Sequence, residues 1–259
     1  MKTHPTAVAR LTLWGVIPAK AGIHACIMVS AALLLTACAN KPVAPDWQAN
    51  AFAALKSFSS AYLIGNTRLA DLEFARAKLE ISSTGRADLL ARAELTRCAA
   101  RVASLEFDNC AAYQPLAQDA PASEQAYAAF LTGHWTGLDV ALLPAQHRAL
   151  VLHAAADKPG DTAASSPKNP NPTAAASVLG AMEDPLARLV AAGVLLQSSR
   201  LTPADIVVAT ETASSQGWRR PLLAWLGVQL TRANDAGERV AAARIQRRID
   251  LVLQVANKN

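Results

Sequence analysis

The sequence predicts an all-α fold in which antiparallel helical hairpins stack on one another. Alanine and leucine dominate the 259 residues, and aromatic side chains make up only 5%, a composition that favours helices over sheets. Apolar residues recur at steps of three or four along several segments, which is the period of an amphipathic helix. Proline and glycine punctuate these segments and divide the chain into consecutive helices.

The predicted N-terminal helical region, residues 47–156, opens with two short helices. Asp46 is a favourable N-cap for a helix over residues 47–63, which Gly65-Asn66 ends. A second helix is expected over residues 68–81, because its apolar side chains share one stripe and its charged side chains lie largely off it. That stripe consists of Ala70, Phe74, Ala77 and Ile81.

A third helix is expected over residues 86–105, with Cys98 on its buried side. On one continuous helix Cys98 and Cys110 would lie about 18 Å apart, whereas a disulfide needs Cα atoms within about 4.4–6.8 Å. A disulfide therefore requires a chain reversal, for which Phe107-Asp108-Asn109 supplies turn residues. We expect this disulfide, with two separate buried thiols as the alternative. The pair supplies too few ligands for a metal site.

The remainder of this region is expected to be less regular. Residues 114–121 form a looser stretch, residues 123–132 a helix and residues 133–137 a glycine-flanked loop. Pro144 begins another helix, which ends near Ala156. Residues 157–176 contain four prolines among small polar residues, which is typical of a flexible linker between two helical halves.

Capping residues and prolines divide the C-terminal helical-hairpin region, residues 177–259, into four predicted helices. Asp184-Pro185 begins the first helix. Thr202-Pro203-Ala204-Asp205 begins the second and combines a capping box with proline at the first helical position. The predicted helices cover residues 185–199, 203–217, 221–235 and 238–255. The last one carries an apolar stripe of Ala241, Ile245, Ile249, Val252 and Val255.

Two helix pairs in this region recur at a spacing of about 34–36 residues. Pro185-Leu186 is echoed by Pro221-Leu222, and Gly193-Val194-Leu195-Leu196 is echoed by Gly227-Val228-Gln229-Leu230. This period resembles that of tetratricopeptide repeats, whose stacked hairpins expose a concave face suited to a peptide or a protein. The Trp-Leu-Gly-Tyr pattern of that family is incomplete here and its closing proline is missing, so a generic α-hairpin stack is the alternative.

The N-terminal apolar run, residues 25–34, ends in Leu35-Thr36-Ala37-Cys38. The run is too short to cross a bilayer, which takes about 20 apolar residues, and it suits the apolar core of a signal peptide. The four residues resemble the lipobox of bacterial lipoproteins. The resemblance implies that residues 1–37 are a cleaved signal peptide and that Cys38 becomes a lipidated N-terminus carrying acyl chains such as palmitate. An ordinary signal peptide with an incidental cysteine is the alternative.

Cleavage before Cys38 would leave 222 residues and lower the net charge from +5 to +2. A near-neutral body gives no reason to expect nucleic-acid binding. Residues 38–46 would form a tether, of which the part after the cysteine reaches about 28 Å when fully extended. In the lipoprotein family an Asp after the cysteine commonly retains the protein in the inner membrane. Ala39 stands there instead, which implies a lipid-anchored, periplasm-facing position at the outer membrane.

The chain contains no Gly-x-Ser-x-Gly, no phosphate-binding Gly-rich loop, no His-Glu-x-x-His and no Cys-x-x-Cys. His147 and His153 are six residues apart, which places them on different helix faces. His134 and Trp135 lie between two glycines and form the most site-like local sequence, although we favour a surface loop with a packed tryptophan. The carboxylates that could serve as general acids are Glu73, Glu80, Glu94 and Glu183, but their spacing singles none of them out and a solvated face is favoured. A basic strip on the last helix could contact anionic lipid or an acidic partner, with a solvated face again favoured; it consists of Arg244, Arg247 and Arg248.

These observations predict a lipid-anchored envelope protein that acts as an interaction scaffold or assembly factor, with no catalytic residue, cofactor or metal. Its expected partners are the membrane, through the lipid at Cys38, and an unidentified envelope protein. That protein is expected to bind a groove along the helices at residues 185–200 and 221–234. The alternative is a peptidoglycan-active enzyme or a regulator of one, which a desolvated carboxylate in a deep cleft would favour.

Overall fold

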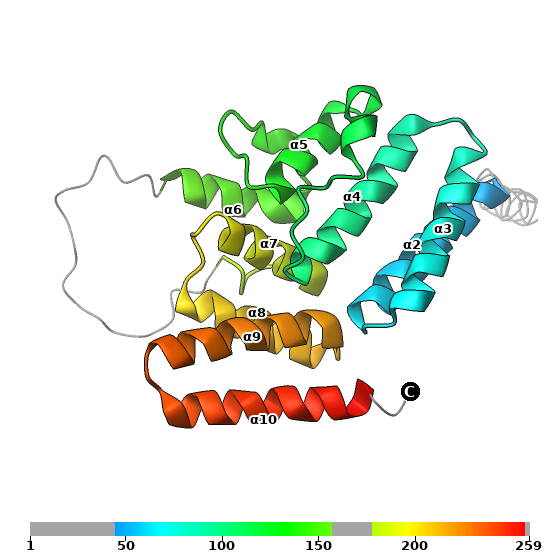
Figure 1. Ribbon diagram of the computed structural model, residues 1–259. Coiled ribbons are helices and arrows are strands. Elements are labelled where there is room, and N and C mark those ends of the chain that lie inside the picture. The colour runs from blue at the N-terminus through cyan, green and yellow to red at the C-terminus, as the bar shows by residue number, and fades with distance from the viewer. Residues whose placement is uncertain (1–44, 157–177, 257–259) are drawn as a thin grey trace, which may run out of the picture. The chain divides into compact units, whose positions relative to one another are not determined.

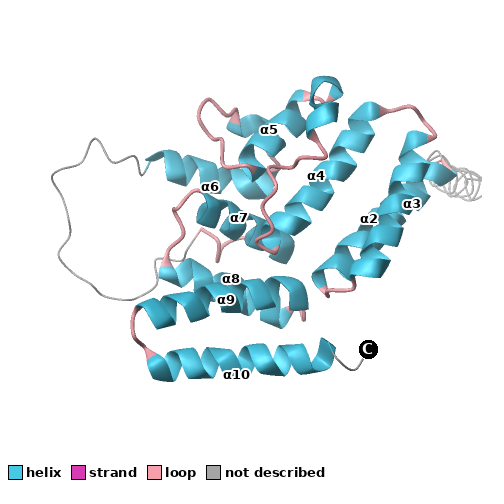
Figure 2. Cartoon of the chain, viewed as in Figure 1, coloured by secondary structure: helices cyan, strands magenta, loops and turns pink. Residues whose placement is uncertain are grey.

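The computed structural model describes residues 45–156 and 178–256, which belong to one compact unit extending from Pro45 to Asn259. Every regular element among these residues is helical (Figure 1, Figure 2). The elements are α2 (Asp46–Leu63), α3 (Thr67–Ser82), α4 (Ala87–Ala103), η1 (Gln114–Asp119), α5 (Ala122–Leu131), η2 (Val140–Leu142), α6 (Ala145–Ala156), α7 (Pro185–Gln197), α8 (Pro203–Ser215), α9 (Arg219–Asp235) and α10 (Arg239–Ala256). The prediction of an all-α fold is confirmed.

Several sequence predictions concern residues outside this part of the chain. The signal peptide at residues 1–37, Cys38, nearly all of the tether and the linker at residues 157–176 lie outside the described residues and stay predictions. Within the two described ranges, no helix combines the length and the apolar character needed to cross a membrane.

Side-chain caps begin α7 and α8 as predicted. The Asp184 carboxylate accepts a backbone N–H of the first turn of α7 at 2.6 Å. At α8 the Thr202 hydroxyl accepts the N–H of Asp205, and the Asp205 carboxylate accepts the N–H of Thr202, which completes the capping box. The prediction of Asp46 as the N-cap of α2 is wrong. Pro45 occupies the N-cap in an extended conformation, and Asp46 is the first helical residue, where its charge suits the positive helix end.

The chain reverses after α4 and brings Cys98 and Cys110 together. The helix ends at Ala103, short of the predicted end, because Leu105 has a φ of 59° and a right-handed helix cannot continue through it. Asp108 accepts the backbone N–H of Cys110 at 3.1 Å, as expected of a turn residue. The two cysteines form a buried disulfide with Cα atoms 5.3 Å apart, as predicted.

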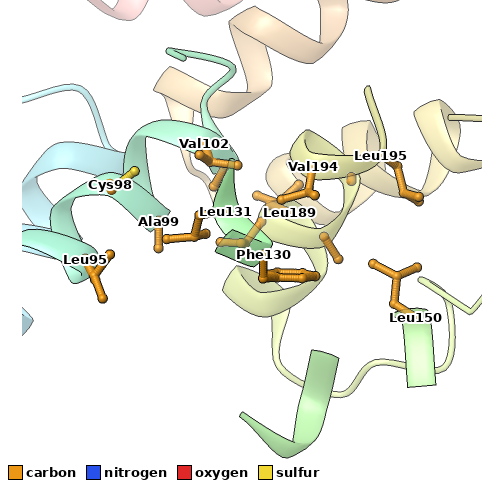
Figure 3. Packing of buried hydrophobic residues seen from close by; sticks show 14 of the residues in the cluster. Leu95, Cys98, Ala99, Val102, Phe130, Leu131, Leu150, Leu189, Val194 and Leu195 are labelled. Atoms are coloured by element: carbon orange, nitrogen blue, oxygen red, sulfur yellow. The ribbon is translucent and has the colours of Figure 1, made fainter. Parts of the chain in front are cut away.

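Consecutive helices pack side by side and form an array of α-hairpins. α2 pairs with α3, α7 with α8, α8 with α9, and α9 with α10 (Figure 1). α4 contacts α2 and α3 as well as α5 and α7, so it connects the first hairpin to the rest of the unit. Side chains from α4, α5, α6 and α7 meet in the main core (Figure 3), to which α8 and α9 also contribute. The two predicted helical regions therefore share one core.

Three residues of the C-terminal region contact the N-terminal helices closely: Gly193 and Trp225 at the end of α4, and Arg220 at the end of α2. Gly193 of α7 faces the end of α4, where a Cβ would clash with the Val102 carbonyl and lie 2.9 Å from Val102 Cγ1. The fully buried Trp225 donates its indole N–H to the Ala103 carbonyl at 3.2 Å. Arg220 donates from Nε to the Tyr62 carbonyl at 2.8 Å, and its guanidinium carbon lies 4.2 Å from the centre of the Tyr62 ring.

Candidate functional site

The predicted binding groove along residues 185–200 is absent, because α7 lies inside the molecule. No residue of α7 is exposed, and the helix packs against α4, α5, α6 and α8. Along residues 221–234 only Thr231, Arg232 and Asn234 are exposed. The apolar repeat that suggested a groove is instead the pattern of side chains that face the core. The one charged residue of α7, Arg188, is half-buried and donates to the Leu179 and Met182 carbonyls.

Large apolar side chains are exposed on the first hairpin and on the last helix. Within the described residues, the five most exposed are Val240 (76%), Leu79 (73%), Phe52 (71%), Leu72 (65%) and Leu251 (64%). Leu72 and Leu79 are seven residues apart and therefore lie on the same side of α3. Together with Leu69 they form a stripe, the outer stripe of α3, opposite the buried stripe that the sequence predicted.

A cavity of about 370 Å³ lies between α4, α5 and the segment before α6. It combines apolar and polar lining residues, as ligand pockets do. The lining residues are Arg92, Leu95, Thr96, Ser123, Glu124, Tyr127, Leu142, Leu143 and Pro144. This cavity is where a reacting carboxylate would lie if the protein were an enzyme, since Glu124 is buried beside it.

The Glu124 carboxylate is held by internal hydrogen bonds. Arg92 donates to one oxygen from Nε at 2.8 Å and from Nη2 at 2.5 Å, and the Ser123 hydroxyl donates to the other oxygen at 2.5 Å. Burial alone would raise the pKa of Glu124, but the hydrogen bonds from Ser123 and Arg92 outweigh it and hold the pKa below its usual range. These hydrogen bonds favour the ionised carboxylate over the protonated form that a general acid requires.

The loop around His134 is a packing element, as the favoured interpretation of its sequence held. Trp135 stacks on Phe130 with ring centres 5.8 Å apart and donates its indole N–H to the Phe130 carbonyl at 3.2 Å. Arg200 lies over the Trp135 ring at 5.4 Å. His134 borders an open cavity of about 520 Å³ beside α5, and its Nδ1 lies 2.9 Å from the Thr132 hydroxyl.

His147 is a buried histidine inside an aromatic cluster. Only 1% of its surface is exposed, and its ring stacks on Phe130 at 4.6 Å and on Tyr127 at 5.8 Å. Its Nδ1 atom has no hydrogen-bond partner among the described residues. Burial lowers the pKa of His147 from 6.5 to about 4, although the charge of Asp184 opposes this. His153 on the same helix is exposed, so the two histidines do not form a pair.

The other predicted carboxylates are dispersed. The expectation that Glu94 lies on a solvated face is wrong, because it is only 3% exposed. Its carboxylate lies 2.9 Å from Lys78 Nζ and 2.7 Å from Arg97 Nη2, and these ion pairs compensate its burial. Glu80 accepts from the Asn50 amide at 3.3 Å. Glu73 lies 3.9 Å from Arg76, and Glu183 is exposed. Across residues 45–156 and 178–256, no cluster of three or more His, Cys, Asp or Glu residues could hold a metal ion.

Comparison with known proteins does not assign a family. The chain matches no protein-family model, and no curated protein and no solved structure matches it.

Two arrangements in these sites join residues that are far apart in the sequence. The Arg92–Glu124 pair joins positions 32 residues apart, and the burial of His147 depends on aromatic residues of another helix. No local sequence pattern could have pointed to either arrangement.

Proposed function

We propose that this chain is an exported lipoprotein, acylated at Cys38, whose helical body binds another envelope protein and catalyses no reaction. The lipobox residues Leu35-Thr36-Ala37-Cys38 support the anchor. The first helix of the body begins at Asp46, so the intervening chain spans at most about 28 Å. Such a short tether would keep the body at the membrane surface.

The disulfide supports export to an oxidising compartment. Cys98 and Cys110 are both buried, and the turn between them places their Cα atoms 5.3 Å apart. Disulfides of this structural kind persist in the periplasm and outside the cell, whereas the cytosol keeps thiols reduced.

The observation that carries the binding role is the outer stripe of α3. The opposite side of α3 packs against α2 and α4, so Leu72 and Leu79 on the outer side have no role in the core of the unit. Charged residues of both signs flank the stripe, including Asp71 and Arg76. An apolar stripe with a mixed polar rim is the composition of a protein–protein interface.

An enzymatic role has weaker support. A lytic enzyme that cleaves glycosidic bonds needs a carboxylic acid with a raised pKa beside its cleft. Glu124 is the buried carboxylate closest to that requirement, and its pKa is lowered by Ser123 and Arg92. We therefore expect Glu124→Gln to retain biological function as long as the variant stays folded. Loss of function in a folded variant that still binds its partner would favour the enzyme.

The anchor is tested by Cys38→Ala. The variant should lose the mass of the acyl chains and should accumulate as unlipidated precursor or be released in soluble form. Unchanged mass and an unchanged membrane fraction would contradict acylation at this residue.

The binding role is tested by introducing charge on the outer stripe of α3. The double variant Leu72→Glu/Leu79→Glu should keep its helical circular dichroism, because both side chains are mostly exposed, and should lose in-cell crosslinks to its partner at least about tenfold. The matched control is Thr231→Glu/Asn234→Glu, which adds two carboxylates at exposed positions of α9. If the two double variants crosslink to the partner equally well, the outer stripe of α3 is not the binding surface.

A further inference from the structure

The last helix, α10, presents two different sides. It packs mainly against α9. Its partly or fully buried positions include Ile245, Ile249 and Val252 of the predicted apolar stripe, and also Ala242 and Arg248, which the prediction did not include. A second row of side chains, at steps of four, three and four residues, faces solvent. This row, called the outward stripe of α10, consists of Val240, Arg244, Arg247 and Leu251.

Acidic residues are sparse beside the outward stripe, where Glu238 borders the same open hollow as Val240 and Arg244. Arg248, beside the stripe, lies 3.2 Å from Glu211 of α8. Neither Arg244 nor Arg247 has an ion-pair partner among residues 45–156 and 178–256. The only acidic residue of α10 is Asp250, which accepts from Gln246 instead. Two exposed guanidinium groups therefore lie between two aliphatic side chains that are 76% and 64% exposed.

We propose that the outward stripe of α10 docks on the surface of an anionic phospholipid layer. Guanidinium groups bind phosphate oxygens in a bidentate manner, and their aliphatic stems can lie along an apolar surface. Val240 and Leu251 would enter the boundary between headgroups and acyl chains, as the apolar residues of interfacial helices do. The proposal rests on the proposed lipid anchor for proximity to the membrane, but not for the chemistry of the contact.

A lipid surface fits this stripe better than an acidic protein does. α9 is the main neighbour of α10, so most of the stripe lies on the outer, convex side of the helix, while Val240 and Arg244 at its start border an open hollow of about 510 Å³. A fluid lipid layer can adapt to a convex side, whereas a protein would need a matching groove. The outer stripe of α3 differs, because acidic and basic residues alternate there and Arg76 is beside Glu73.

The test uses the unlipidated body, residues 39–259, whose described part forms one compact unit with its own core. The body is sedimented with vesicles of phosphatidylcholine alone or with about one-third phosphatidylglycerol, at low and at high salt. Each basic residue near an anionic surface strengthens binding about fivefold. We therefore expect Arg244→Gln/Arg247→Gln to weaken binding to anionic vesicles about 25-fold, and added salt to weaken wild-type binding.

The matched control is Arg68→Gln/Arg232→Gln, which removes the same charge at exposed positions of α3 and α9. It should bind anionic vesicles nearly as well as wild type. The variant Val240→Ser/Leu251→Ser should bind more weakly while retaining its salt dependence.

Equal binding to neutral and anionic vesicles, or equal weakening by the stripe variant and its control, would overturn the proposal. So would loss of a crosslinked acidic protein without any change in vesicle binding. Because the body in this experiment has no acyl chain, a negative result would leave acylation at Cys38 and the outer stripe of α3 unaffected.

Discussion

Acidification should destabilise this protein through His147. In the folded chain the imidazole is buried against Phe130 and Tyr127, and its Nδ1 has no hydrogen-bond partner among the described residues. The charged form is therefore disfavoured, and the pKa is lowered from 6.5 to about 4. In the unfolded chain the same imidazole is solvated and keeps its ordinary pKa.

Proton linkage gives the sign and the size of this loss of stability. At about pH 7.5 and above the imidazole is neutral in both states, so its contribution to stability is fully present. Between pH 6.5 and about 4 the unfolded chain binds a proton that the folded chain does not, so the free energy of unfolding falls as the pH falls. The loss amounts to about 2 kcal/mol at pH 5 and approaches about 3 kcal/mol near pH 4.

The assay is urea unfolding, followed by circular dichroism, at about pH 7.5 and pH 5. His147→Phe keeps an aromatic ring at the position and removes the titration, while the carboxylates titrate as before. Between the two pH values, the free energy of unfolding of wild type should therefore fall by about 2 kcal/mol more than that of the variant. The reasoning is refuted if His147→Phe shows the wild-type pH dependence, or if the His147 imidazole titrates near pH 6.5 by NMR.

Three further predictions concern the contacts of α4, two with the C-terminal helices and one with the turn that follows α4. Gly193→Ala should lower the free energy of unfolding by about 1–3 kcal/mol, because α4 and α7 must separate to admit the methyl group; an unchanged urea midpoint would contradict this. Trp225→Phe should lower the free energy of unfolding by about 1–3 kcal/mol in the same assay, because the buried Ala103 carbonyl loses its hydrogen-bond donor. An unchanged urea midpoint would mean that this hydrogen bond does not stabilise the fold. Cys98→Ser/Cys110→Ser should lower the free energy of unfolding by about 3 kcal/mol. A reductant should lower the stability of wild type by a similar amount and should leave the stability of the variant unchanged.

Local patterns predicted the helices better than they predicted the surface. Capping residues and prolines located α7 and α8 because these signals act within one turn of the chain. The Asp46 cap failed for an equally local reason, since Pro45 already occupied the preceding extended position. The groove along residues 185–200 failed for a different reason. An apolar helix face has the same pattern whether it faces a partner or the core, and periodicity cannot distinguish the two.

By itself, the sequence determined the all-α fold, the start sites of α7 and α8, and the need for a chain reversal if Cys98 and Cys110 are bonded. These properties depend on interactions between residues close together along the chain, whose geometry backbone and side-chain chemistry dictate. Only the tertiary structure decided that α7 is central, that Arg92 holds Glu124, and that α3 and α10 carry exposed stripes. Those outcomes depend on which helices cover which faces, and that choice is made by close packing between segments far apart in sequence.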